Sequence, residues 1–131
     1  MSPFTERELA YLRAEDAGPR LARIATVGSD GTPHVVPVGW RLAADDVIEI
    51  GGVRLERTKK FRDVQRSGTA AIVIDDLASV SPWRPRGVEI RGRAEAQAGE
   101  TPVIRLHPQR IVSWGLESER VGERHSRSVD D

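Results

Sequence analysis

The residues with the greatest capacity for chemistry form a cluster of cations between two strand-like segments. Residues 54–66 contain six basic and two acidic side chains, in a chain whose formal net charge is zero. An excess of four positive charges at one connection indicates an anion site, and a phosphate is the simplest ligand for it. The alternative is a solvated helix face around an apolar stripe of Phe61 and Val64.

Other groups that could act in catalysis are scattered. There is no cysteine, and the three histidines lie far apart in the sequence, at positions 34, 107 and 125. Disulfides and thiolate metal sites are therefore excluded, and we expect no bound metal. An imidazole can serve as a general acid, but His34 and His107 are each isolated in the sequence, so we interpret both as structural.

Composition limits the class of protein. A chain of 131 residues, 38% of them hydrophobic, has room for one core. The N-terminal residues lack the basic and apolar segments of a signal peptide, and no apolar run is long enough to span a membrane, so we expect a cytoplasmic protein. Equal numbers of acidic and basic residues, 20 of each, argue against a dedicated nucleic-acid binder.

The elements that must position the basic cluster are mainly strands. Residues 5–8 have a capping-box pattern, which predicts a short N-terminal helix. Turn residues at 29–32 separate two strand-like runs, 21–27 and 33–41, and predict a hairpin. Pro37 cannot donate to a strand ladder, which places its strand at an edge or at a bulge.

Further segments complete the predicted sheet. They are strands at 47–51, 69–74, 87–95 and 103–116, the last interrupted at Pro108, a short helix near 59–65 and a long loop at 77–86. This pattern predicts a mainly β fold, an antiparallel barrel of six or seven strands with short peripheral helices. We expect residues 1–116 to form this domain and residues 117–131, which carry eight charges, to be a disordered tail.

With these elements placed, the chain resembles a known group of enzymes. It is similar to the flavin and deazaflavin oxidoreductases of the pyridoxamine 5′-phosphate oxidase-like superfamily, whose fold is a split β-barrel, and above all to small actinobacterial members described as coenzyme F420-dependent. The segments that carry the resemblance are 21–40, 59–64, 75–94 and 104–115. The likeness extends, in order, over residues 5–116.

The resemblance implies a homodimer with two cofactor sites built across its interface. In the family, the segment that matches residues 59–62 binds the cofactor phosphate, and Lys60 occupies the position of its most regular lysine. A lysine suits a phosphate because it is a flexible point charge, and the first amides of a following helix add neutral donors. The expected assisting residues are Lys59, Thr58, Arg62 and Arg57, with Arg54 and Arg66 left at the surface.

The same resemblance places a flat cofactor ring beside the second strand. Val36, Pro37 and Val38 match a stretch whose backbone lies along the isoalloxazine or deazaflavin ring, although an ordinary irregular edge strand explains these residues equally well. Trp83, between two prolines, resembles an aromatic residue that reaches the site from the partner subunit and stacks on the ring. A loop anchor or dimer contact is an equal alternative for Trp83. Trp40 is expected in the core or at the interface.

These implications favour an oxidoreductase in which reduced coenzyme F420 transfers a hydride to an unsaturated organic substrate. FMN in the same site is the alternative, because both cofactors combine a phosphate with a three-ring system. A non-catalytic flavin or F420 carrier is a second alternative. A single-stranded nucleic-acid binder ranks low, since only Phe61 interleaves with the cations. No catalytic side chain is assigned.

Two features depart from the family pattern. Pyridoxamine-phosphate oxidases proper have a C-terminal extension with substrate-binding arginine and histidine, which residues 117–131 do not match, so vitamin B6 oxidation is not expected. The link from Ala94 to Val103 contains Gly99 and Pro102 and leaves little room for the helix that many relatives insert there. Such a short link would open one wall of the pocket.

Overall fold

The computed structural model describes residues 2–14, 20–116 and 123–129, and it confirms the mainly β fold. Seven strands follow one another in one antiparallel sheet, in the order β2-β1-β5-β6-β7-β4-β3, and β8 pairs with β7. The strands are β1 (Ala22–Val27), β2 (Pro33–Val38), β3 (Trp40–Leu42), β4 (Ile48–Ile50), β5 (Thr69–Ser79), β6 (Arg84–Gln97), β7 (Val103–Trp114) and β8 (Arg124–Ser128). The helices are α1 (Glu6–Leu12), α2 (Lys59–Ser67) and a 3-10 turn, η1 (Leu55–Arg57).

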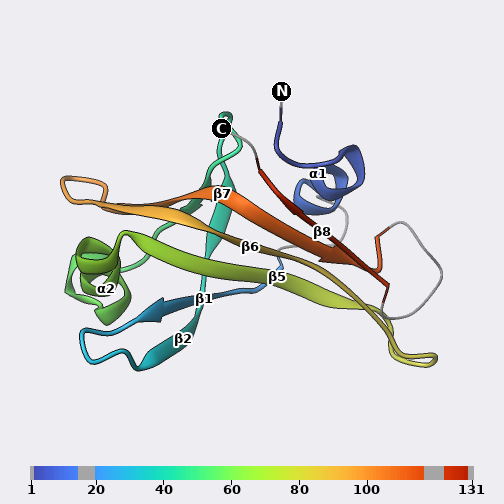
Figure 1. The fold of residues 1–131 in the computed structure, drawn as a ribbon, viewed down its shortest axis with the longest axis horizontal. Helices are drawn as coiled ribbons and strands as arrows, with labels where there is room; N and C mark the ends of the chain where they lie inside the picture. Colours follow the sequence, from blue (N-terminus) through green and yellow to red (C-terminus); the bar gives the residue numbers. More distant parts are fainter. Residues whose placement is uncertain (1, 15–19, 117–122, 130–131) are drawn as a thin grey trace.

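The sheet curls because the chain joins its two ends. β2 and β3 lie at opposite ends of the strand order, yet Gly39 alone separates them in the sequence. One residue spans at most about 3.6 Å, so these two strands must lie close together. The sheet therefore bends back on itself as an open, split barrel (Figure 1).

Both predicted helices are present and are capped as expected. In α1, Thr5 accepts from the backbone N–H of Glu8 while the Glu8 carboxylate accepts from the backbone N–H of Thr5, which confirms the capping box. In α2, the Thr58 side chain accepts from the N–H of Phe61. Phe61 and Val64 are buried in the core, each burial stabilising the fold by roughly 1.5–3 kcal/mol. The apolar stripe predicted for this helix is thus the face that packs inward.

The prediction of a long loop at 77–86 is wrong. β5 and β6 remain paired to Leu77↔Pro85 and Ser79↔Arg84, so a short turn joins two long strands. The prolines suggested a loop because each removes one backbone donor. Pro82 lies in the turn itself and Pro85 near the end of the ladder, where losing one donor interrupts little of the pairing.

The interruption expected at Pro108 is a bulge inside one continuous strand, β7. The register against β6 shifts there, from Arg91↔Arg110 to Gly92↔Pro108. A Cβ at Gly92 would lie 1.9 Å from the His107 carbonyl oxygen, so the bulge requires glycine opposite it.

The expectation of a disordered tail is wrong for residues 124–128. They form β8, which pairs with β7 from Trp114↔Arg124 to Arg110↔Ser128. Arg127 also reaches α1, where its guanidinium donates to the Glu8 carboxylate and to the Pro3 carbonyl. The high charge of this segment predicted disorder. A strand that pairs with only one neighbour needs few apolar residues, however, when a buried carboxylate binds one of its side chains. Residues 117–122 and 130–131 of the expected tail lie outside the described residues.

Candidate functional site

Helix α2 holds a buried carboxylate, that of Asp63, between two donors. Thr26 Oγ1 on β1 donates to Asp63 Oδ2 at 2.8 Å, and Lys59 Nζ donates to Asp63 Oδ1 at 3.2 Å. Burial by itself would raise the pKa of Asp63, but the hydrogen bonds from Thr26 and Lys59 outweigh it and hold the pKa below its usual value. Asp63 is therefore ionised at neutral pH, and Lys59 is its counter-ion.

Lys60 differs from its neighbour. It is half-buried, and no carboxylate pairs with it among the residues that the structure describes. Burial lowers the pKa of the Lys60 ammonium, because part of its hydration is lost. An anion placed against the Lys60 ammonium would offset that loss of hydration.

Three other residues of the basic segment, Thr58, Arg62 and Arg66, have side-chain partners within the fold. The Thr58 hydroxyl caps α2 and donates to the Leu55 carbonyl oxygen at 2.6 Å, so it serves the helix end. Arg62 is exposed and donates to the Arg57 carbonyl oxygen at 2.9 Å. Arg66 is exposed, as expected, but its guanidinium also donates to the Val27 carbonyl oxygen and thereby ties α2 to β1.

Edge strand β2 runs from this helix to a cavity. β2 pairs with β1 on one side and has no second strand neighbour among the described residues, which confirms the edge position predicted from Pro37. At its start, a Cβ on Gly28 would lie 3.0 Å from Lys59 Nζ and 3.4 Å from His34 Nε2, so the hairpin turn meets α2. From His34 to Val38 the strand extends about 13 Å, and Val35, Val36 and Pro37 are exposed along it.

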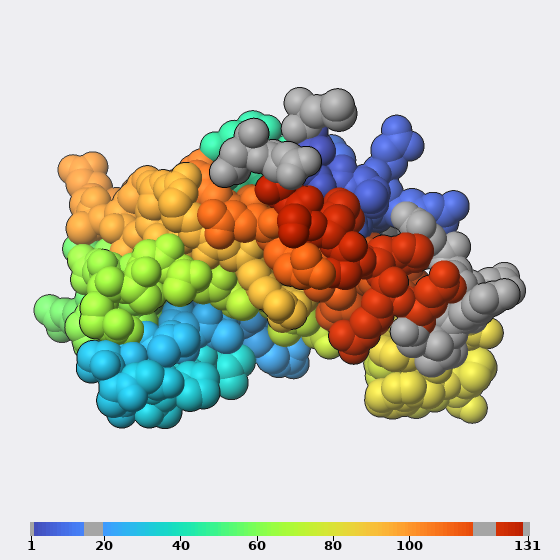
Figure 2. Space-filling model, in the orientation of Figure 1, coloured from blue at the N-terminus to red at the C-terminus, as the bar shows by residue number. Residues whose placement is uncertain are grey.

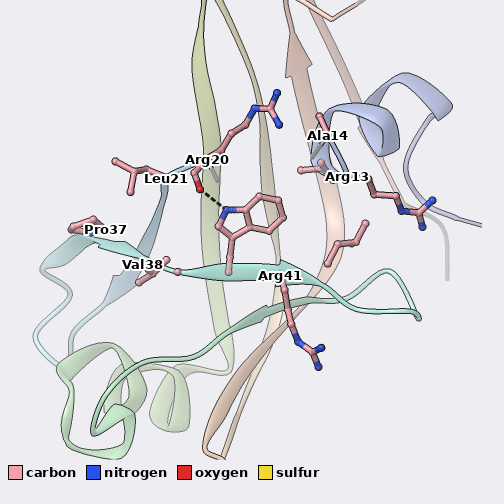
Figure 3. A pocket seen from close by; sticks show the side chains of 11 residues that line it. Arg13, Ala14, Arg20, Leu21, Pro37, Val38 and Arg41 are labelled. Carbon is pink, nitrogen blue, oxygen red and sulfur yellow. Dashed lines mark hydrogen bonds between the residues drawn. The ribbon is translucent and has the colours of Figure 1, made fainter. Parts of the chain in front are cut away.

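The cavity at the end of β2 has a volume of about 700 Å³ (Figure 3). The end of α1, the start of β1 and the junction of β2 with β3 form its walls. Trp40 Nε1 donates to the Arg20 carbonyl oxygen at 2.9 Å, which fixes the indole against the start of β1. The lining residues are Leu12, Arg13, Ala14, Arg20, Leu21, Pro37, Val38, Gly39, Trp40, Arg41 and Leu42. Pro37 and Val38 of the predicted ring contact therefore lie in this cavity, and Val36 lies just outside it.

Trp83 lies far from α2, but the hollow that it lines shares Arg20 and Leu21 with the cavity at the end of β2. Trp83 stands in the turn between β5 and β6, which Figure 1 shows at the opposite end of the molecule from α2. The turn projects from the body of the protein (Figure 2), and Trp83 is 60% exposed. With Leu21 and Leu77 it lines a hollow of about 640 Å³. One chain therefore does not bring Trp83 to Lys60, because β5 alone spans roughly 30 Å between them.

The short link between β6 and β7 also borders a cavity. No helix lies between Gln97 and Val103, as the sequence predicts. Thr101 and Pro102 of this link form one wall of a cavity of about 620 Å³, and Trp40 and Arg41 form another. The two cavities thus meet at the start of β3, and Trp40 contributes to both.

Sequence reasoning missed three participants. Trp40 was assigned to the core or interface, but it is half-buried and lines both cavities. Arg20 was not considered, since no motif marks it. Asp63 was counted only as a charge in the basic run. Its spacing from Lys59, four residues along a helix, was a usable signal for an ion pair.

The curled sheet, with a basic helix at one end and an exposed edge strand leading to a cavity, is the architecture of a split β-barrel. The model of the family described as pyridoxamine 5′-phosphate oxidase matches residues 9–126, and the chain belongs to this family. The family consists of oxidoreductases, and this chain is an enzyme of that kind. Membership of this family indicates a flavin-type cofactor.

Individual proteins are also similar to this chain in sequence or in fold. The chain is similar to the 5a,11a-dehydrotetracycline/5a,11a-dehydrooxytetracycline reductase of Streptomyces rimosus subsp. rimosus, with 39% identity over 137 residues, covering 97% of this chain and 94% of that protein. A heme-binding protein from Mycobacterium smegmatis has a TM-score of 0.71 at 19% identity, covering 95% of this chain and 58% of that one. An F420 reductase has a TM-score of 0.56 at 18% identity, covering 71% and 89%. At these identities the two structures support the fold alone.

In the ranges 2–14, 20–116 and 123–129, no helix is long and apolar enough to cross a membrane. In the same ranges, no group of three or more histidine, aspartate or glutamate side chains is placed to hold a metal ion.

Proposed function

We propose that the protein is a reductase that uses reduced coenzyme F420 to transfer a hydride to a conjugated, fused-ring substrate. The observation that carries the proposal is the path along β2, which starts beside the first turn of α2 and ends in the cavity at Val38 and Trp40. A cofactor with a phosphate at one end and a flat ring at the other matches that path. The similarity to a dehydrotetracycline reductase supports a fused-ring substrate.

The described residues fit such a cofactor. Lys60 would hold the phosphate, because its half-buried ammonium has no carboxylate partner in the described part of the chain. A hydrogen bond to a charged group contributes about 1.5–3 kcal/mol. The outward backbone groups of β2 would contact the ring edge, and the exposed Val36 would cover part of its face. Bound F420 would supply the hydride, while the protein contributes orientation and exclusion of water.

The substrate would occupy the cavity beside the ring. Its volume of about 700 Å³ lies within the usual range of roughly 300–1,000 Å³ for small-molecule sites. Trp40 offers a flat apolar wall whose orientation is fixed by its bond to Arg20. Such a wall suits the face of a fused-ring molecule.

We further propose that the working protein is a homodimer. Apolar side chains stay exposed on β1, on β2 and on the β5–β6 hairpin, among them Leu21 at 62% and Val80 at 70%. A monomeric protein rarely leaves such a group of side chains uncovered. In a dimer, the projecting turn with Trp83 would reach the ring site of the partner subunit.

Three other functions are alternatives to the proposed reductase. FMN would occupy the same path with its own phosphate and ring. A carrier would bind the cofactor and turn over no substrate. Binding of single-stranded nucleic acid would require aromatic platforms beside the cations, and Phe61, the aromatic residue of the basic segment, is buried.

Parallel fluorescence titrations with F420 and FMN test the proposal, followed by turnover assays with each reduced cofactor and 5a,11a-dehydrotetracycline as probe substrate. We expect tighter binding of F420 and consumption of reduced F420 that depends on the probe. Tighter binding of FMN would favour the flavin alternative. Tight binding of either cofactor without turnover against dehydrotetracyclines, enones and quinones would favour a carrier. No binding of either would refute the proposal.

A further inference from the structure

The charge of Lys59, the neighbour of Lys60, is balanced by Asp63, whose side chain points away from solvent. Asp63 is on α2 but faces β1, and both of its carboxylate oxygens are used, one by Thr26 and the other by Lys59. Its side chain is 5% exposed, whereas that of Lys59 is 47% exposed. The buried anion is therefore anchored in the sheet, and the more mobile cation is drawn to it.

The pairing of Lys59 with Asp63 should persist when a ligand binds nearby. A buried carboxylate that loses its counter-ion is strongly destabilised. The spacing of four residues on a helix brings the two side chains together without strain. The Lys59 ammonium is also directed toward the β1–β2 turn, since a Cβ on Gly28 would lie 3.0 Å from it.

Two adjacent lysines thus have different charge environments. Lys59 is neutralised inside the protein, and Lys60 has no carboxylate partner among the described residues. Exposed arginines of the same segment, such as Arg57 and Arg62, attract every anion at longer range. The number of lysine charges available to a ligand at this turn is therefore one.

We propose that Asp63 determines cofactor specificity as a positioning residue: by binding and neutralising Lys59, it leaves one free lysine charge for the phosphate and makes the site favour a singly charged phosphodiester over a doubly charged phosphomonoester. This inference rests on the proposed function. F420 carries its phosphate as a diester with one negative charge, whereas the monoester of FMN carries about 1.5 to 2 at neutral pH. Coulomb energy is proportional to ligand charge, so a second free lysine would benefit FMN about twice as much.

The test uses two ligands that differ by one charge, FMN and its methyl phosphodiester, with F420 as a third. Asp63→Asn keeps the size of the side chain and an acceptor for Thr26, but it releases the charge of Lys59. We expect the Asp63→Asn variant to bind the methyl diester about threefold and FMN about tenfold more tightly than wild type does. The preference between the two ligands should therefore shift about threefold toward FMN.

Two matched variants separate specificity from stability. In Lys59→Met/Asp63→Asn the shift toward FMN should disappear, because the released charge is gone. Thr26→Val removes the buried hydrogen bond and keeps both charges, so it should lower the thermal midpoint and leave the preference unchanged. Equal changes for both ligands in Asp63→Asn, or a shift that survives the double variant, would overturn the role of Asp63 alone. Failure of the wild-type protein to bind F420 or FMN would overturn the proposed function and this inference with it.

Discussion

At the scale of single residues, Lys60 is the side chain that we propose holds the cofactor phosphate. It is half-buried, with its pKa lowered by burial. We predict that Lys60→Ala weakens cofactor binding about 10- to 100-fold, since one charge-assisted contact contributes about 1.5–3 kcal/mol. The free energy of unfolding should change by less than about 0.5 kcal/mol, because Lys60 is not part of the buried core. Fluorescence titration and chemical denaturation measure the two quantities.

A matched control for Lys60 is Arg54, a cation of the same segment. Arg54 is exposed and has a left-handed backbone with φ of 53°. Arg54→Asn removes the charge and tolerates that conformation. This variant should bind the cofactor within about twofold of wild type. Equal losses in the two variants would mean that the segment acts only through its total charge.

At the scale of elements, β8 holds α1 in place. The Glu8 carboxylate is almost completely buried and accepts from Arg127, from the Thr5 amide and from Ser113. Arg127→Ala leaves that carboxylate without its cation, so we predict a loss of about 2–4 kcal/mol in the free energy of unfolding. Chemical denaturation measures it. Arg124→Ala, at the exposed start of β8, should cost less than about 1 kcal/mol.

The same contact predicts a dependence of stability on pH. Burial alone would raise the pKa of Glu8, but the hydrogen bonds from Arg127, Thr5 and Ser113 hold it below the usual value. The pKa is therefore lower in the folded chain than in the unfolded chain. The resulting stability is fully present above about pH 4.5 and is lost as the pH falls through the folded pKa. Unfolding curves of Glu8→Gln between pH 3 and 7 should lack this component, and an unchanged acid slope would contradict it.

At the scale of the whole molecule, the projecting turn with Trp83 and the helix with Lys60 belong to different ends of one chain. In the proposed dimer, each site combines Lys60 of one subunit with Trp83 of the other. A mixed dimer of Lys60→Ala and Trp83→Ala chains should therefore contain one intact site and one doubly altered site. We predict about one tight cofactor site per mixed dimer, where each parent homodimer has none.

Isolation of the mixed dimer with two different affinity tags, followed by titration, counts its sites. If Trp83 acted within its own chain, both sites of the mixed dimer would carry one defect and tight binding would be absent. If the protein were a monomer, no mixed species would be isolated. Both outcomes would contradict the proposed arrangement.

Local patterns predicted the elements that form the site, but not all of their lengths. The hairpin predicted from turn residues is present as β1 and β2, and the helix predicted around an apolar stripe is present as α2. The second strand was predicted to reach residue 41, but it ends at Val38, and Trp40–Leu42 form β3, which pairs with β4. The strand pairing beyond Leu77 was not predicted, because prolines in a short sequence segment are compatible both with a loop and with the end of a hairpin. β8 was missed for a similar reason, since Arg127 gains its role from Glu8, 119 residues away.

By itself, the sequence determined the strand order along the chain, the edge position of Pro37 and the concentration of cations at one connection. These features depend on neighbouring residues and on backbone chemistry. The tertiary structure decided which lysine is available, because Asp63 is held by Thr26, 37 residues away. It also decided that β2 ends at the cavity beside Trp40, and that the turn with Trp83 lies at the end of the molecule opposite α2. These relative positions result from the curling of the sheet, and they cannot be predicted from residue spacing in the sequence.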